Sequence, residues 1–359
     1  MFRTDGISNR SLTFTLIVLY LCATLQFIRY YSKTTTFYLN MNAYLNGHER
    51  LPFQERILPI LILRPLTHSQ WITQHLVHAN GMYTAERGPF YVISLCGLLL
   101  AGIFVQRLYN RVTRSGTLSF LVYPIFLFAI MWSYSIHNEA NFSYPYDILS
   151  VAFFTAGLYY IYMKQFLPLV FIMVLGTLNR ETTLFLIGIY LLDAASTSYS
   201  EATRTLRKRF SWSQVSWARV GLLVFLWLGI KLLLAHVFAH NDNSENYIRI
   251  SENFGRLKPR LWPALLNICG YMLPVVFVLR RDLRPRRFAN YLYIFPLWFV
   301  VMFYTGVIVE TRVYGELCSF VAIAIVLIME YRIEHLRQRV PARVADPGIP
   351  YGRLADMEQ

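Results

Sequence analysis

The sequence predicts an all-α polytopic protein that crosses a membrane about ten times, with a long outer loop after the first span. Of its 359 residues, 55% are hydrophobic and 15% are charged, which is too apolar for an ordinary soluble domain. The net charge of +14 comes from basic residues in short clusters between apolar runs. A topology signal or contact with anionic membrane lipid explains such clusters better than nucleic acid does. We therefore expect membrane lipid, and no nucleic acid, as a partner.

The candidate spans are apolar runs close to the length that crosses a bilayer. The first run follows basic residues, but no small-residue cleavage site comes after it, so we expect an uncleaved span rather than a signal peptide. The last run is followed by a Pro- and Gly-containing tail that is typical of disorder. We expect one membrane domain over residues 1–335 and a disordered cytoplasmic tail over residues 336–359. The runs cover residues 12–28, 89–106, 118–136, 147–163, 166–178, 182–193, 216–238, 263–279, 290–308 and 313–331.

The densest basic runs indicate the orientation of the chain. Counting spans places residues 107–114, 204–209, 280–287 and the basic tail on the side of the N-terminus, which the positive-inside rule makes cytoplasmic. We expect an integral membrane protein with both termini in the cytoplasm. The loops expected on the other side are residues 29–88, 137–146, 179–182, 239–262 and 309–312.

The runs at residues 166–178 and 182–193 are short for spans. About a dozen residues give roughly 20 Å of helix, against a hydrocarbon core of roughly 30 Å. Merging the two runs would restore a normal length, but it would bury the polar residues 179–181 at mid-membrane and move the basic run 204–209 outside. We favour a short hairpin whose polar tip lies below the outer surface.

The first outer loop is too long to be a simple connector. Its apolar stretch Ile57 to Leu66 is too short to span a membrane and contains Pro59 and Pro65, which suits a helix that lies in the membrane interface. Apolar residues at helical spacing over residues 68–80 predict a second interfacial helix.

Four polar clusters lie at the ends of spans, all on the expected non-cytoplasmic side. Ionisable groups at the hydrocarbon boundary are costly, so such clusters indicate a functional site. We expect the four to converge on one site that faces this side. The clusters are Gln54-Glu55-Arg56, His137-Asn138-Glu139 with Tyr144-Pro145-Tyr146-Asp147, Asn179-Arg180-Glu181-Thr182, and Glu310-Thr311-Arg312.

The arginines of these clusters suit a phosphate ligand, because guanidinium binds phosphate oxygens in a bidentate way and stays charged. The alternative for Arg180 and Glu181 is a buried structural pair that joins helices, and the alternative for Glu55 and Arg56 is a helix cap or internal ion pair. The expected substrate-binding residues are Arg56, Tyr146, Asp147, Asn179, Arg180, Glu181, Glu310, Arg312 and Tyr314.

Tyr144 and Tyr146 could stack against a sugar ring, and the alternative is that they belong to an interfacial aromatic belt. A carboxylate at the lipid–water boundary could act as a general base. Glu55 is the preferred catalytic residue and Glu139 is the second.

No motif indicates a cofactor or a metal. His68, His75 and His78 lack a nearby carboxylate that would complete a metal site, and no nucleotide-binding loop is present. Each cysteine lies within or at the edge of an apolar run without CxxC spacing. We interpret the cysteines as small core residues. We expect no cofactor, and a divalent metal is unsupported.

The layout and two sequence segments resemble the polytopic glycosyltransferases of the GT-C superfamily. The segment AYLNGHERLPFQERILPILILRPL (residues 43–66) is similar to a loop of uncharacterised bacterial members, and LNRETTLFLIGIYLL (residues 178–192) is similar to another of their segments. The layout resemblance covers residues 10–335. These enzymes usually carry an acidic residue early in the first outer loop, but residues 30–46 contain no carboxylate. Glu49, Glu55, Glu139 or Asp147 would have to replace it.

The resemblance implies an inverting sugar transferase of the bacterial inner (plasma) membrane. It would use a polyprenyl-phosphate-linked sugar as donor and a glycan, lipid or protein as acceptor on the non-cytoplasmic side. An acidic side chain would deprotonate the acceptor, and Arg180 and Arg312 would stabilise the departing phosphate. The alternatives are a polysaccharide polymerase or ligase that acts on lipid-linked oligosaccharide, and a transporter or flippase. A transporter would carry charges at mid-depth on several spans and open to both faces.

Overall fold

The computed structural model describes residues 9–72, 74, 75, 86–136, 142–196, 210–243, 245, 247–257 and 266–344. This part of the chain is mostly helical, which confirms the all-α part of the prediction but not the count of ten spans. Its two strands, β1 (Thr36–Phe37) and β2 (Phe142–Ser143), are short and pair in parallel, with Thr36 opposite Phe142. The pairing ties the end of the first helix to the segment that carries Tyr144 and Tyr146.

Six helical segments of the described chain are long and apolar enough to cross a membrane, as an integral membrane protein requires. These helices differ in how much of their apolar stretch is buried. The stretches of α1 and α10 are each 17% buried, whereas that of α16 is 89% buried. α1 and α10 therefore present apolar side chains to lipid, and α16 belongs to the core. The long helices are α1 (Asn9–Thr34), α5 (Arg87–Val112), α6 (Ser119–Met131) continued by the π-helix η2 (Trp132–Ile136), α10 (Trp217–Val237), α14 (Arg286–Ala289) continued by η6 (Asn290–Tyr293) and α15 (Ile294–Thr305), and η7 (Thr311–Leu317) continued by α16 (Cys318–Val344).

Shorter helices occupy most of the remaining predicted spans. α7 (Asp147–Tyr162) packs against α5, α8 (Phe166–Asn179) and α9 (Leu184–Ala195). Because α7 is apolar on nearly every side, it suits the bundle interior. The predicted run 263–279 is only partly helical, since α13 covers Met272–Val278, and residues 258–265 lie outside the described part.

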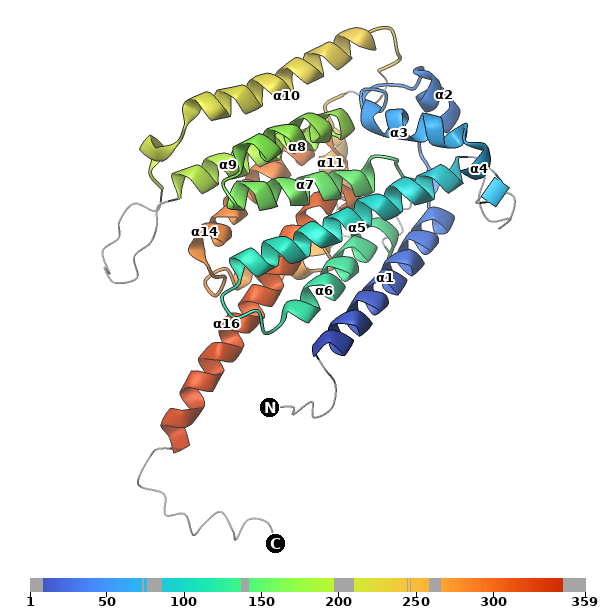
Figure 1. Cartoon of the computed structure of the whole chain (residues 1–359). Helices are drawn as coiled ribbons and strands as arrows, with labels where there is room; N and C mark the ends of the chain where they lie inside the picture. Colours follow the sequence, from blue (N-terminus) through green and yellow to red (C-terminus); the bar gives the residue numbers. More distant parts are fainter. Residues whose placement is uncertain are drawn as a thin grey trace.

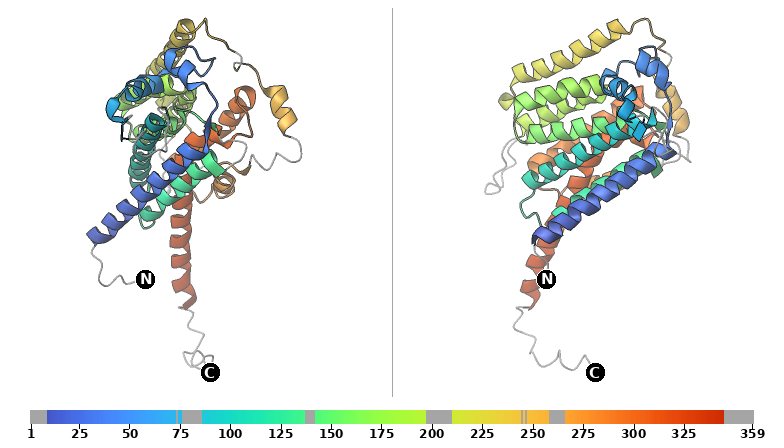
Figure 2. Two further views of the ribbon diagram at one scale, coloured as in Figure 1. Left: turned by 90° about the vertical axis from the view of Figure 1, so that its right-hand side faces the viewer. Right: turned by 45° about the vertical axis from the view of Figure 1, so that its right-hand side comes forward.

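The two ends of the bundle carry different segments of the chain. Figure 1 shows α1 and α5 to α10 running side by side, with the start of α1 and the end of α16 at the same end. The loops at residues 113–118 and 280–287, which adjoin or contain predicted basic runs, lie at this end, and the views in Figure 2 agree. The short helices of the first outer loop lie at the opposite end. We call the two ends the terminal end and the loop end.

The short runs form a helical hairpin in the described structure. α8 ends at Asn179, the 3-10 helix η4 (Glu181–Thr183) makes the tip, and α9 returns along α8. The rings of Phe166 and Tyr190 therefore lie close together, with 6.0 Å between their centres. The tip is tight because a Cβ at Gly176 would lie 2.8 Å from Thr183 Oγ1. The polar residues of the tip thus reach the loop end instead of crossing mid-membrane.

The first outer loop contains the expected short helix, α3 (Ile57–Thr67). It follows α2 (Met41–Asn46), where the Asn40 side chain accepts a hydrogen bond from the amide of Ala43 and Gly47 ends the helix with φ of 90°. Of the second expected helix, α4 (Gln70–Ile72) is described, whereas residues 73 and 76–85 lie outside the described part. Two further elements are η5 (Trp212–Gln214) and α11 (Ile250–Arg256).

Two sequence interpretations differ from the structure. α16 continues through Val344, so the predicted tail from residue 336 starts as helix. No glycine or proline interrupts the helix before Pro341, which lies in its last turn. Cys22 and Cys96 are exposed, whereas Cys269 and Cys318 are buried. The first two lie on outward faces of helices and are not core residues.

Candidate functional site

Described members of all four polar clusters meet at the loop end of the bundle. Arg56 contacts Glu181, and both Arg180 and Arg312 face Asp147. Residues 137–141, which include the predicted catalytic Glu139, lie outside the described part of the chain. The described clusters come from the first outer loop, the start of α7, the α8–α9 tip and η7, so the fold assembles the site from four separate segments.

Asp147 lies at the centre of this group. It is the first residue of α7 and is fully buried. Its Oδ1 is 3.6 Å from Arg180 Nη1, and its Oδ2 is 4.0 Å from Arg312 Nη1. Neither oxygen has a hydrogen-bond partner among the described residues. The start of a helix favours a negative charge, and two arginines offset the cost of burial, but Asp147 remains without a direct hydrogen bond.

Arg180 has its closest carboxylate in a distant segment. Its Nη1 lies 3.2 Å from Oε1 of Glu316 in η7, and the Thr182 hydroxyl donates to the same oxygen at 2.7 Å. The sequence alternative of a pair between Arg180 and Glu181 is therefore wrong, because these neighbours point to different partners. Sequence analysis did not assign Glu316 to the site, although its place in an otherwise apolar span was a signal.

Arg56 forms the pair with Glu181 instead. Its Nη2 donates to Glu181 Oε1 at 2.6 Å and its Nε donates to Oε2 at 3.1 Å, which makes a bidentate contact. The guanidinium also lies over the Tyr146 ring, 4.2 Å from the ring centre. Burial raises the pKa of Glu181, but Arg56 and then Lys231 lower it more strongly, and the pKa ends well below its usual range.

Arg312 is held by its own segment and by Tyr144. Its Nη2 donates to Glu310 Oε2 at 2.5 Å and to the Tyr144 hydroxyl at 3.2 Å, and its guanidinium lies over the Tyr144 ring at 4.1 Å. Tyr144 and Tyr146 are buried and face arginines. They are therefore part of the site and do not form a lipid-facing belt.

Glu55 is paired with a lysine that sequence analysis did not assign. Lys231 of α10 donates to Glu55 Oε2, and Trp227 on the same helix donates to the Glu181 carbonyl at 3.1 Å. These two contacts attach α10 to the site through Lys231 and Trp227. The suggested internal pair of Glu55 with Arg56 is absent among the described contacts, since each binds elsewhere.

The remaining predicted residues support the site in different ways. The Asn179 side-chain amide donates to the Tyr146 carbonyl at 3.0 Å, which joins the hairpin tip to the start of α7. Tyr314 donates to the Ile308 carbonyl at 3.3 Å and packs on Phe299. It therefore stabilises the turn before η7 and does not face Asp147 directly.

Among the described residues, no group of three or more His, Cys, Asp or Glu side chains is placed to hold a metal ion. His68 Nδ1 lies 2.7 Å from the Arg64 carbonyl, and His75 Nδ1 lies 2.9 Å from the Trp71 carbonyl. His78 lies outside the described part of the chain.

The described residues of the site include four cationic side chains and five carboxylates, so one carboxylate has no cation of its own. Each of the four cations of the site has a carboxylate partner closer than Asp147. The four pairs are Arg56 with Glu181, Arg180 with Glu316, Lys231 with Glu55, and Arg312 with Glu310. Asp147 is the fifth carboxylate. Buried Nε groups of Arg180 and Arg312 also lack hydrogen-bond partners within the described part of the chain. The site thus offers both donors for an anion and one carboxylate able to accept a proton.

Comparison with known proteins gives no identity for the chain. No family model, curated protein or solved structure matches it.

Proposed function

We propose that this protein is an integral-membrane glycosyltransferase that moves a sugar from a polyprenyl-phosphate donor to an acceptor on the non-cytoplasmic side. The observation that carries the proposal is the position of Asp147 between Arg180 and Arg312. Asp147 is a buried carboxylate whose oxygens accept no hydrogen bond from the described residues. Group transfer from a phosphate needs a cationic clamp for the leaving group and a base for the acceptor. Both are available within a few ångströms of each other.

The long distances from Arg180 and Arg312 to Asp147 would allow both arginines to leave Asp147 and bind a phosphate instead. Arg180 and Arg312 lie 3.6 Å and 4.0 Å from Asp147, which is too far for hydrogen bonds. A donor phosphate that bound these guanidiniums would weaken two loose contacts and would gain charge-assisted hydrogen bonds. Asp147 would then be free to accept the proton of an acceptor hydroxyl.

The base assignment moves accordingly from Glu55 to Asp147. A general base needs a lone pair that can reach the acceptor, but Glu55 is held by Lys231. Glu55 would instead keep α10 against the site. With a single displacement at the anomeric carbon, the acceptor oxygen bonds to that carbon, the bond to the phosphate oxygen breaks, and the configuration inverts.

The test uses purified protein in lipid nanodiscs with a panel of radiolabelled polyprenyl-phosphate sugars. We expect one donor to lose its label to an acceptor, and we expect Asp147→Asn to stop this loss while donor binding persists. Movement of intact labelled lipid or solute across sealed vesicles, without cleavage, would favour the transport alternative.

A further inference from the structure

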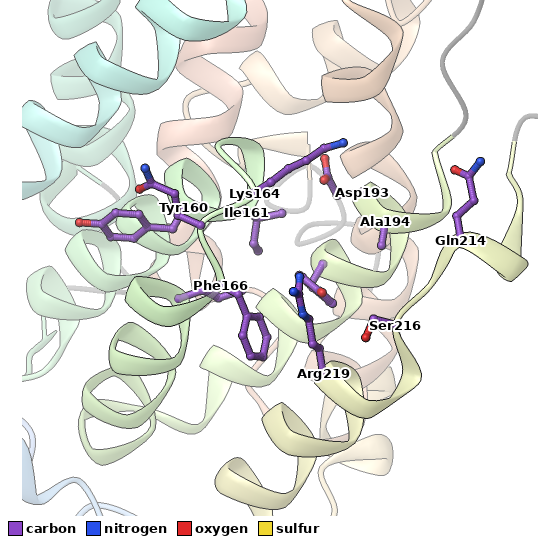
Figure 3. A pocket seen from close by; sticks show the side chains of 12 residues that line it. Tyr160, Ile161, Lys164, Phe166, Asp193, Ala194, Gln214, Ser216 and Arg219 are labelled. Atoms are coloured by element: carbon purple, nitrogen blue, oxygen red, sulfur yellow. The ribbon is translucent and has the colours of Figure 1, made fainter.

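A pocket with both apolar and charged lining residues lies at the terminal end of the bundle, away from Asp147. It has a volume of about 230 Å³ and is lined by the end of α7, the α7–α8 turn, the end of α9 and the start of α10. Figure 3 shows Lys164 on the α7–α8 turn and Arg219 at the start of α10 beside the pocket, with the Phe166 ring next to Arg219. The arginines of the candidate site do not line it, so the proposed transfer reaction leaves it unexplained.

The described residues that line the pocket carry more positive than negative charge. Among them Asp193 is the one acidic residue, and both of its oxygens accept hydrogen bonds from Arg287, each at 2.7 Å. Its Oδ1 also accepts from the Tyr291 hydroxyl at 2.5 Å. The pair of Asp193 and Arg287 is therefore neutral. Lys164 and Arg219 add two positive charges beside it, which favours an anionic ligand.

The backbone fixes one of the two cations at the rim. Lys164 has a φ of 57°, in the left-handed region. The amide of Lys164 donates to the Ile161 carbonyl at 3.0 Å, and the amide of Gln165 donates to the Tyr160 carbonyl at 2.9 Å, as in a Schellman motif that ends a helix. Glycine is the usual residue at such a position, so a lysine here costs backbone energy that a glycine would avoid.

Exposed apolar side chains continue from the pocket onto the outer faces of α8 and α10. Leu167 is 79% exposed, Phe171 is 63% exposed and Trp217 is 60% exposed. The basic pocket and the apolar outer surface thus lie next to each other on α8 and α10. This combination suits a molecule with an anionic head and apolar chains. The basic loops at this end place the pocket at the membrane–water boundary, where basic pockets between helices bind anionic lipid head groups.

We propose that this pocket binds one anionic phospholipid. The head-group phosphate lies between Lys164 and Arg219, and the acyl chains lie along Leu167, Phe171 and the outer face of α10. The bound lipid joins α10 to the α7–α8 turn at the terminal end, as Glu55 and Lys231 join α10 to the first outer loop at the loop end. This lipid is a component of the membrane and is not the donor substrate.

The first experiment measures phospholipid retention by native mass spectrometry of the purified full chain. Phosphatidylglycerol is compared with phosphatidylcholine. We expect one phosphatidylglycerol to be retained. Lys164→Gly combined with Arg219→Gln should weaken its binding about 30-fold, because each basic residue near an anionic surface contributes a similar share of the binding free energy and the variant removes two of them. Because glycine fits the backbone at residue 164, this variant should fold.

Two control variants separate the pocket from general surface charge. Lys164→Arg with Arg219→Lys keeps both charges and should retain the lipid. Arg111→Gln with Arg281→Gln removes the same charge from exposed positions at the same end and should also retain it. Equal weakening by this second pair, or no weakening by the pocket variant, would overturn the proposal. Displacement of the lipid by equimolar inorganic phosphate would also overturn it, since the site would then bind free phosphate.

A second measurement needs no variant. Photoactivatable phosphatidylglycerol in vesicles of the unmodified protein should label peptides that contain residues 160–169 and 212–219, and the phosphatidylcholine analogue should label them much less. Equal labelling by both analogues would mean that the pocket does not select an anionic head group.

Discussion

Arg56 binds Glu181, which lies 125 residues away in the chain, with Nη2 2.6 Å from Oε1. The contact joins the first outer loop to the tip of the α8–α9 hairpin. The two side chains differ in environment, because the Arg56 side chain is 9% exposed and that of Glu181 is 34% exposed. This difference in exposure determines how strongly a substitution at each residue should destabilise the protein.

Glu181→Gln should destabilise the protein more than Arg56→Gln. The first change leaves a buried guanidinium without its bidentate partner, whereas the second leaves a partly exposed carboxylate that still lies near Lys231. The double variant should recover part of the loss. Thermal unfolding in detergent measures all three, and the reverse order of the single variants would mean that Arg56 is held mainly by Tyr146.

The same pair predicts a pH dependence of stability. Glu181 has a pKa of 4.5 in the unfolded chain, and its folded pKa is lower. A lowered carboxyl pKa contributes stability that is complete above the unfolded value and is lost as the pH falls towards the folded value. We expect the wild-type unfolding temperature to fall more steeply between about pH 5 and pH 3 than that of the Arg56→Gln, Glu181→Gln double variant. Parallel curves would show that other carboxyls control acid unfolding.

Arg180 is predicted to serve both stability and ligand binding. Arg180→Ala leaves Glu316 and Asp147 buried without this cation, and removing one partner of a buried pair typically costs about 3–5 kcal/mol. Adding Glu316→Gln should restore much of the stability, because fewer buried charges remain uncompensated. If Arg180 also holds a donor phosphate, the restored double variant should still lack donor binding.

The matched control for this experiment is Glu316→Gln alone, which keeps the guanidinium. It should retain measurable donor binding. A double variant that recovers both stability and donor binding would assign Arg180 a purely structural role.

Topology is predicted by the arrangement of the two bundle ends. A reporter fused after Ser198 should report the cytoplasm, and a reporter near Asn243 should report the opposite compartment. Ser198 lies outside the described part of the chain, so its placement follows from the end of α9 at Ala195 and the start of α10 at Trp217. An external signal at Ser198 would contradict the proposed orientation of the whole bundle.

The sequence was sufficient to predict the segments of the site but not their partners. Apolar length and basic loops predicted the helical hairpin and the common end of the clusters, because those depend on hydrophobic patterning along the chain. The pairing of Arg56 with Glu181 and of Arg180 with Glu316 depends on side-chain direction across long sequence distances, which patterning does not contain. Lys231 was overlooked because a single lysine in the apolar run of α10 does not interrupt its length as a span.

The final prediction distinguishes Asp147 from Glu55 as the general base. Asp147→Asn keeps the size of the side chain but removes the proton acceptor, so turnover should fall by roughly 10²–10⁴-fold while donor binding persists. Glu55→Gln should instead act through Lys231, which loses its carboxylate partner. Its effect should be a lower unfolding temperature, with turnover of the folded fraction largely retained.

A companion variant separates these roles further. Lys231→Gln combined with Glu55→Gln removes both charges of the pair and should return the unfolding temperature towards that of the wild type, with turnover retained. If Glu55→Gln abolishes turnover in protein of unchanged stability and Asp147→Asn does not, the base is Glu55, as the sequence alone suggested. If only Glu139→Gln abolishes turnover, the base belongs to the loop before α7, and Asp147 serves to hold Arg180 and Arg312.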